Sequence, residues 1–259
     1  MQAIAGIAFA LQLAAAWVVG VRLLRLARRT GELPEKLLGT MMLSLMGLGY
    51  PLAIGALAEG TLGLLAARAF QNVSNFLIDL GFALIFVFTW RVFRSEARWA
   101  KLACVTVFVL LGVHFVAVAR IVAELASMRD AVEAARIWAF LPLGIGALGM
   151  LWTGFEALRY YALIEKRVAL GLATPALANR FLLWGWMGIT MGAGAGANLY
   201  FLATHIDVVA DPRAQSVTSA VGLAQAVLLY LTFLPPRRYA RWIETRWGAP
   251  RADSAGSRA

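Results

Sequence analysis

The chain has 259 residues, of which 61% are hydrophobic and 15% are charged, and its formal net charge at pH 7 is +10. Soluble domains carry about 25% charged residues, so this composition excludes a water-soluble fold and indicates a protein embedded in lipid. The positive charge lies in short segments between apolar runs, which favours membrane lipid headgroups as its partners and excludes nucleic acid.

Seven apolar runs follow one another, and each is long enough to cross a bilayer as a helix. They cover about residues 2–22, 37–58, 62–90, 102–123, 137–158, 181–204 and 213–234. The first run contains no charge before Arg22, which is typical of a retained span and not of a signal peptide. The sequence therefore predicts an all-α membrane protein, with a seven-transmembrane-helix bundle over residues 1–235.

Local signals mark several of the helix starts. Pro34, Pro175 and Pro212 stand at the beginnings of the second, sixth and seventh helices, where proline suits the first turn. Ser127 and Asp130 fit a capping box, which predicts a short surface helix before the fifth span.

The distribution of basic residues predicts the orientation of the bundle. Five of the 24 lysines and arginines fall on one side, at Arg68, Arg120, Arg129, Arg136 and Arg213. The others occupy the loops of the opposite side and the C-terminal segment. Since basic loops stay in the cytoplasm, we expect an outside N-terminus and a cytoplasmic C-terminus. The expected location is the plasma membrane, or the inner membrane of a bacterium.

After the last span, residues 236–248 are predicted to form an amphipathic interfacial helix. Tyr239, Trp242, Ile243 and Trp247 fall on one face, and arginines fall on the other. This helix is expected to rest on the membrane surface or, alternatively, to dock a cytoplasmic partner protein together with the basic loops. Residues 249–259 are predicted to be a disordered tail.

Ionisable residues at membrane depth are costly and are therefore functional candidates. Asp79 lies 12 residues before Arg91, which places it about 18 Å from the inner end of the third helix. His114 lies 13 residues after Lys101, at a depth of about 20 Å in the fourth helix. A short loop joins these helices, so we expect them to be neighbours and expect Asp79 and His114 to approach each other.

Other polar residues share this region of the bundle. Asn72 and Asn75 lie on the same helix face as Asp79. Tyr50 and Gln225 lie at a similar depth, and Asn198 lies further out. Together with Asp79 and His114, these residues are candidates for ligand binding or proton relay. The alternative is that they form interhelical hydrogen bonds, which are worth only about 0.6 kcal/mol each.

Two further features concern helix packing. Gly192, Gly194 and Gly196 are expected to let the sixth helix pack closely against its neighbours. Pro51 and Pro142 are expected to kink the second and fifth helices and to shape an internal cavity.

Glu156 lies close to the inner membrane interface. We expect an ionic contact there with a nearby arginine, either Arg159, Arg180 or Arg91. Such a contact would make Glu156 a structural residue, and it is not among the candidates for the site.

The topology resembles that of the rhodopsins and the G-protein-coupled receptors, but the resemblance does not extend to residues. The seventh helix has no lysine for a retinal Schiff base, because all three lysines lie in predicted loops. The two histidines, His114 and His205, are too few for a three-histidine zinc site and lie too far apart in depth to hold a haem. With Cys104 as the only cysteine, the sequence predicts no metal and no cofactor.

These observations leave four classes of function open. We expect a receptor-like protein that senses or binds a small ligand within the bundle. The alternatives are a proton or ion channel or transporter that uses Asp79 and His114, an intramembrane lipid-modifying enzyme, and a scaffold for other membrane proteins. The enzyme is disfavoured because the chain shows no nucleophile motif and no set of metal ligands.

Overall fold

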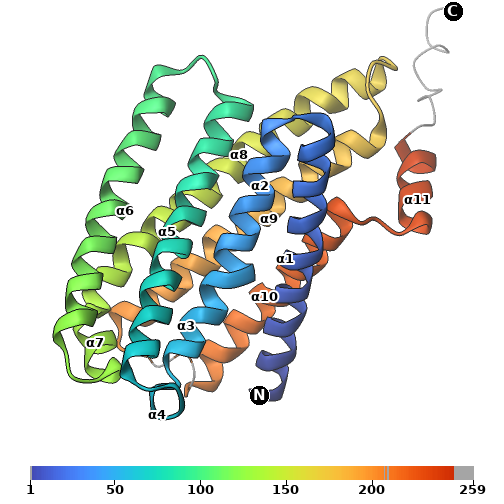
Figure 1. Ribbon diagram of the computed structural model, residues 1–259. Coiled ribbons are helices and arrows are strands. Elements are labelled where there is room, and N and C mark those ends of the chain that lie inside the picture. The colour runs from blue at the N-terminus through green and yellow to red at the C-terminus, as the bar shows by residue number, and fades with distance from the viewer. Residues whose placement is uncertain (1, 207, 209, 248–259) are drawn as a thin grey trace, which may run out of the picture.

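The computed structural model describes residues 2–206, 208 and 210–247, and every regular element in this part is a helix (Figure 1). The chain-order elements are α1 (Gln2–Thr30), α2 (Leu33–Met42), the π-helix η1 (Leu43–Gly49), α3 (Tyr50–Ala56), α4 (Glu59–Leu62), α5 (Leu64–Phe93), α6 (Arg98–Glu124), α7 (Met128–Ala135), the 3-10 helix η2 (Arg136–Ala139), α8 (Phe140–Ala169), α9 (Pro175–Ala203), α10 (Pro212–Phe233) and α11 (Arg237–Trp247). The predicted tail at 249–259 lies outside the described residues.

Six helical segments of the described chain are long and apolar enough to cross a membrane. They are Gly6–Thr30, Leu33–Ala56, Leu64–Phe93, Arg98–Glu124, Met128–Ala169 and Pro212–Phe233. The sixth predicted run also forms a helix, the 29-residue α9, but its glycines, tryptophans and asparagine lower its mean hydropathy and keep it outside these six. The chain is thus a multi-pass, membrane-embedded helical protein, and the count of seven spans stays a prediction.

The long helices form one bundle with two distinct ends (Figure 1). The chain begins at the lower end of the view, where α4 and α7 also lie. The connections from α1 to α2, from α5 to α6 and from α8 to α9 lie at the upper end. "Lower" and "upper" are used below in this sense.

The second predicted span is interrupted in its middle by the π-helix η1. Pro51 has no backbone N–H, so a helical carbonyl before it loses its donor. The indole N–H of Trp17 donates to the carbonyl of Gly47 at 3.0 Å, and the hydroxyl of Ser74 donates to the carbonyl of Gly49 at 2.8 Å. Side chains from α1 and α5 therefore satisfy the backbone that the irregular segment leaves open, as lipid-embedded helices require.

Helices α8 and α9 approach each other through glycine backbone. A Cβ atom on Gly188 would lie 2.6 Å from the carbonyl oxygen of Met150 and 2.7 Å from Cα of Gly154. A Cβ atom on Gly154 would lie 2.9 Å from the backbone nitrogen of Ile189. Only glycine fits at this crossing, as is typical of close helix contacts in membranes.

The three glycines singled out in the sequence behave differently from one another. A Cβ on Gly192 would lie 2.5 Å from Leu151 of α8, and one on Gly194 would lie 2.7 Å from Val221 of α10. Gly196 has open space around the same position. Close packing of α9 is therefore confirmed at two of the three glycines, and the contact of Gly188 with the backbone of α8 was not predicted.

Aromatic side chains fill the upper half of the bundle. Ring centroids lie 5.1 to 5.8 Å apart in the pairs Phe86–Trp152, Phe88–Trp184, Phe93–Tyr160, Tyr160–Phe181 and Trp184–Phe233. These pairs join α5, α8, α9 and α10 into a continuous core. The upper half of the bundle is thus densely packed.

The last described helix, α11, contacts α9 near the upper end. The hydroxyl of Tyr239 donates to Oδ1 of Asn179 at 3.1 Å, and Ile243 is buried. A helix is thus present where one was predicted, with bounds Arg237–Trp247 in place of 236–248.

Candidate functional site

Asp79 and His114 form a buried pair between α5 and α6. Nδ1 of His114 lies 2.8 Å from Oδ2 of Asp79, and each side chain is only 7% exposed. The depths calculated from the sequence led us to expect this approach, and the two side chains are in contact. The other carboxylate oxygen, Oδ1, is buried and has no hydrogen-bond partner among the described residues.

A cavity of about 900 Å³ lies in the lower half of the bundle. Its walls come from α1, η1, α3, α5 to α7, η2 and α8 to α10, and the predicted candidates Tyr50, Asn75, His114, Asn198 and Gln225 all line it. Pro142, one of the two prolines expected to shape a cavity, also lines it, and Pro51 directly follows Tyr50.

Two of the predicted residues lie outside the lining. Asp79 lies behind His114 and holds its ring through Nδ1, which leaves Nε2 as the imidazole nitrogen not engaged by Asp79. Oδ1 of Asn72 is buried without a hydrogen-bond partner among the described residues. Asn72 and Asn75 were expected to act together, but the structure brings only Asn75 to the cavity.

Hydrogen bonds orient several amide side chains of the cavity wall, although Nδ2 of Asn75 is buried without a hydrogen-bond partner among the described residues. Nε2 of Gln71 donates to Oδ1 of Asn75 at 2.9 Å, and Nδ2 of Asn198 donates to the carbonyl of Gly194 at 3.0 Å. Nε2 of Gln225 donates to Thr190 Oγ1 at 2.5 Å and to the carbonyl of Met187 at 3.1 Å. Because their donors are used in these bonds, Asn198 and Gln225 hold defined orientations beside the cavity.

The residues at the mouth of the cavity were not predicted from the sequence. Glu133 and Arg136 line it at the lower end, with Nη1 of Arg136 3.6 Å from Oε1 of Glu133. Nη2 of Arg136 also donates to the carbonyl of Leu202 at the end of α9, at 2.9 Å. The capping box did predict α7, and the Ser127 hydroxyl accepts from the backbone N–H of Asp130. It carried no signal that this helix would cover a cavity.

Two charged side chains bind the backbone at the start of α7 and in the segment just before it. Oε2 of Glu59 accepts from the N–H of Met128 at 2.8 Å, and Nη2 of Arg68 donates to the carbonyl of Leu125 at 2.6 Å. Met128 and Ala131 are buried against α5 and α6. The helix that covers the mouth is therefore anchored on both sides.

No match to this chain was found among protein families, curated proteins or solved structures. The topological resemblance to the rhodopsins and G-protein-coupled receptors gains no support from these comparisons. Within the described residues, no three His, Cys, Asp or Glu side chains come together as a metal site would require. The geometry of the cavity is thus the basis for assigning a function.

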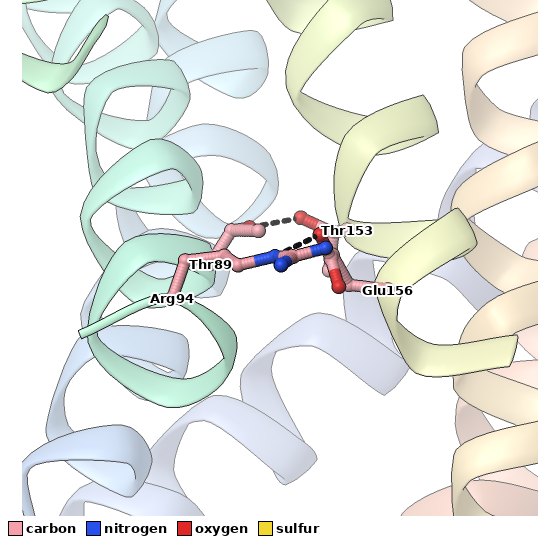
Figure 2. A network of polar contacts seen from close by, with 4 residues as sticks. All are labelled: Thr89, Arg94, Thr153 and Glu156. Carbon is pink, nitrogen blue, oxygen red and sulfur yellow. Dashed lines mark hydrogen bonds and ion pairs between the residues drawn. The ribbon is translucent and has the colours of Figure 1, made fainter. Parts of the chain in front are cut away.

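A second polar cluster lies at the upper end, between α5 and α8 (Figure 2). Nε of Arg94 lies 2.6 Å from Oε1 of Glu156, whose side chain is 8% exposed. The hydroxyls of Thr89 and Thr153 contact each other one helical turn away. Each is also bonded to the carbonyl four residues earlier in its own helix.

The expected partners of Glu156 were wrong. Arg94 follows the end of α5, where the backbone leaves the helical conformation with φ −139° and ψ 37°. Figure 2 shows its side chain reaching from this end toward α8. Arg94, which was predicted to lie in a loop, therefore forms the ion pair with Glu156, and Arg159, Arg180 and Arg91 do not.

Proposed function

We propose that this chain is a plasma-membrane protein of receptor-like topology that binds a small, largely apolar ligand in the cavity at its lower end. The Asp79–His114 pair carries the proposal. His114 lines the cavity while Asp79 holds its ring from behind, so that an oriented polar group faces a cavity whose lining is mostly apolar. A concave, mostly apolar site with a few oriented polar groups is typical of small-ligand binding.

The energetics of the pair favour a role beyond stability. Burying two ionisable groups in a membrane bundle is costly, and replacing such a pair by apolar residues is often neutral or stabilising. Oδ1 of Asp79 also lacks a hydrogen-bond partner among the described residues, so the contact is incompletely satisfied. The cost of placing this pair at membrane depth supports a functional role for it.

We further propose that α9 is the seventh span and that the lower end faces outward. The close packing of α9 against α8 at Gly188 and against α10 at Gly194 supports this proposal. The charge distribution supports the orientation, because the upper-end connections carry most of the basic residues. On this orientation, α11 and the basic loops face membrane lipids and a partner protein in the cytoplasm.

The test is to fill the cavity and to look for loss of a bound molecule. Ala195 of α9 lines the cavity, whereas Ala193 of the same helix is exposed on the outer surface of the bundle. We expect native mass spectrometry of mildly extracted protein to detect a small molecule on the original chain and on Ala193→Trp. We expect the signal to be lost on Ala195→Trp. Equal occupancy in both variants would place the ligand elsewhere.

Proton or cation transport is the second candidate, and the buried ion pair is the observation that favours it. The dense aromatic core above Phe82 opposes it, because it separates the cavity from the upper end. Transport predicts a flux in proteoliposomes that disappears in Asp79→Asn. Unchanged flux in that variant would remove the pair from any relay.

A further inference from the structure

We propose that the ligand is an uncharged amphiphile whose carbonyl or hydroxyl oxygen accepts a hydrogen bond from Nε2 of His114. This inference rests on the proposed function and specifies the chemistry of the same cavity. Three independent features of the described residues support it: the buried contact of Asp79 with Nδ1 of His114, the pairing of the charges around the cavity, and the apolar floor.

The possible protonation states of the pair define what His114 can offer. If the pair is an aspartate and an imidazolium, both ring nitrogens carry a proton. If it is a carboxylic acid and a neutral imidazole, Oδ2 donates to Nδ1, and the ring proton is on Nε2. Nε2 is therefore a hydrogen-bond donor in both states that have no net charge.

Only one arrangement of the pair makes Nε2 an acceptor. It combines a charged carboxylate with a neutral imidazole protonated on Nδ1, and it leaves a net negative charge in the bundle. The carboxylate is 7% exposed and Oδ1 has no partner among the described residues, so this state carries a large desolvation cost. The ligand that fits the other two states presents an acceptor oxygen.

The remaining charges around the cavity do not call for an ionic ligand. The Arg136 guanidinium is engaged by Glu133 and by the Leu202 carbonyl. His205 also lines the cavity, but it is an exposed residue just after the end of α9 and lies away from the deeper part. The other polar groups deeper in the cavity are amides and hydroxyls, such as those of Asn75, Gln225 and Tyr50. A carboxylate or an ammonium group would lose its hydration there without gaining an unpaired counter-charge.

The floor of the cavity is suited to the apolar part of the ligand. Phe82 lies one turn above Asp79 on α5, and Met46, Met150 and Met191 line the same region. Methionine side chains are flexible and polarizable, so they adapt to varied apolar shapes. A volume of about 900 Å³ accommodates a molecule with a sizeable hydrocarbon part.

A matched series of ten-carbon probes tests the inference on the full chain in detergent. The four probes are 2-decanone labelled with ¹³C at the carbonyl, decane, decanoate and decylammonium. We expect the ketone to bind about 3- to 10-fold more tightly than decane, the worth of one hydrogen bond. We expect both ions to bind at least about 10-fold more weakly than the ketone. The carbonyl stretching band of the bound ketone should shift to lower frequency.

Variants of His114 identify the donor. His114→Gln places an amide N–H near the position of Nε2 and should retain the shifted band. The double variant Asp79→Asn with His114→Phe removes the donor without leaving an unpaired charge, and should lose the shift and the preference over decane. Val113→Phe is the control, because Val113 is exposed on α6 and lies outside the cavity lining.

Tighter binding of decanoate or decylammonium would overturn the inference but leave ligand binding in place. Equal binding of ketone and decane without a band shift would overturn it as well. If no probe binds and Ala195→Trp loses no native ligand, the proposed function itself fails.

Discussion

At the scale of single residues, two ion pairs join neighbouring helices of the bundle. Asp79 pairs with His114 in the lower half, and Arg94 pairs with Glu156 in the upper half. Each pair joins α5 to a different neighbour, α6 in one case and α8 in the other. Helix α5 is therefore held by one polar contact in the lower half of the bundle and by another in the upper half.

Breaking the lower pair from one side should be more damaging than removing it completely. We expect His114→Leu to lower the free energy of unfolding by about 3 kcal/mol, because it leaves the Asp79 carboxylate buried without a partner. Asp79→Leu combined with His114→Leu should recover most of this loss. Reversible unfolding in mixed detergent micelles measures both values. Strictly additive effects of the two substitutions would show that the side chains do not act as a pair.

The upper pair gives a prediction that separates Arg94 from the partners expected from sequence. Arg94→Met should destabilise the bundle by about 1 to 3 kcal/mol, since it removes a charged hydrogen bond to a buried carboxylate. Arg159→Met is the control, because Arg159 is exposed and should change stability by less than about 0.5 kcal/mol. A larger effect for Arg159 in the same unfolding assay would restore the pairing expected from sequence.

The contrast between these pairs shows what sequence can establish at this scale. The depths of Asp79 and His114 follow from helix rise and charged helix ends, so their approach was predictable. Arg94 stands in a non-helical turn, where helix geometry no longer dictates the direction of a side chain. The partner of Glu156 therefore depended on a turn conformation that residue spacing does not encode.

At the scale of elements, irregular segments build the walls of the cavity. The π-helix η1 precedes α3 and brings Met46 and Tyr50 to the cavity. An irregularity near Pro51 was predictable from its missing N–H, but the π-helical segment before it also uses donors from Trp17 and Ser74, which lie in other helices. Apolar runs predict spans well, and they contain no information about such tertiary donors.

The α8–α9 crossing supplies a matched pair of glycine substitutions. Gly188→Ala should destabilise the protein by more than about 2 kcal/mol, because the new Cβ would clash with backbone atoms of α8 that cannot move aside. Gly196→Ala places a Cβ in open space and should be neutral or stabilising by up to about 1 kcal/mol. Thermal unfolding in detergent compares the two. Similar losses at both positions would contradict the observed crossing.

At the scale of the whole molecule, the two halves of the bundle differ in packing. The upper half is filled by aromatic rings, whereas the lower half contains the cavity under α7. A packed half that supports an open half is suited to holding a site in a fixed shape. This arrangement agrees with ligand binding at one side of the membrane, and it makes the orientation of the bundle the next quantity to measure.

Single cysteines test both the orientation and the span count. In a Cys104→Ser background, Leu172→Cys reports on the α8–α9 connection, and Arg213→Cys reports on the start of α10; both positions are exposed. If α9 crosses the membrane, the two positions lie on opposite sides. We then expect a membrane-impermeant thiol reagent applied outside intact cells to label Arg213→Cys and to leave Leu172→Cys unlabelled. Arg129→Cys near the start of α7 should be labelled as well.

Labelling of Arg213→Cys and Leu172→Cys from the same side would show that α9 does not span. A fully reversed pattern would place the cavity on the cytoplasmic side of the membrane.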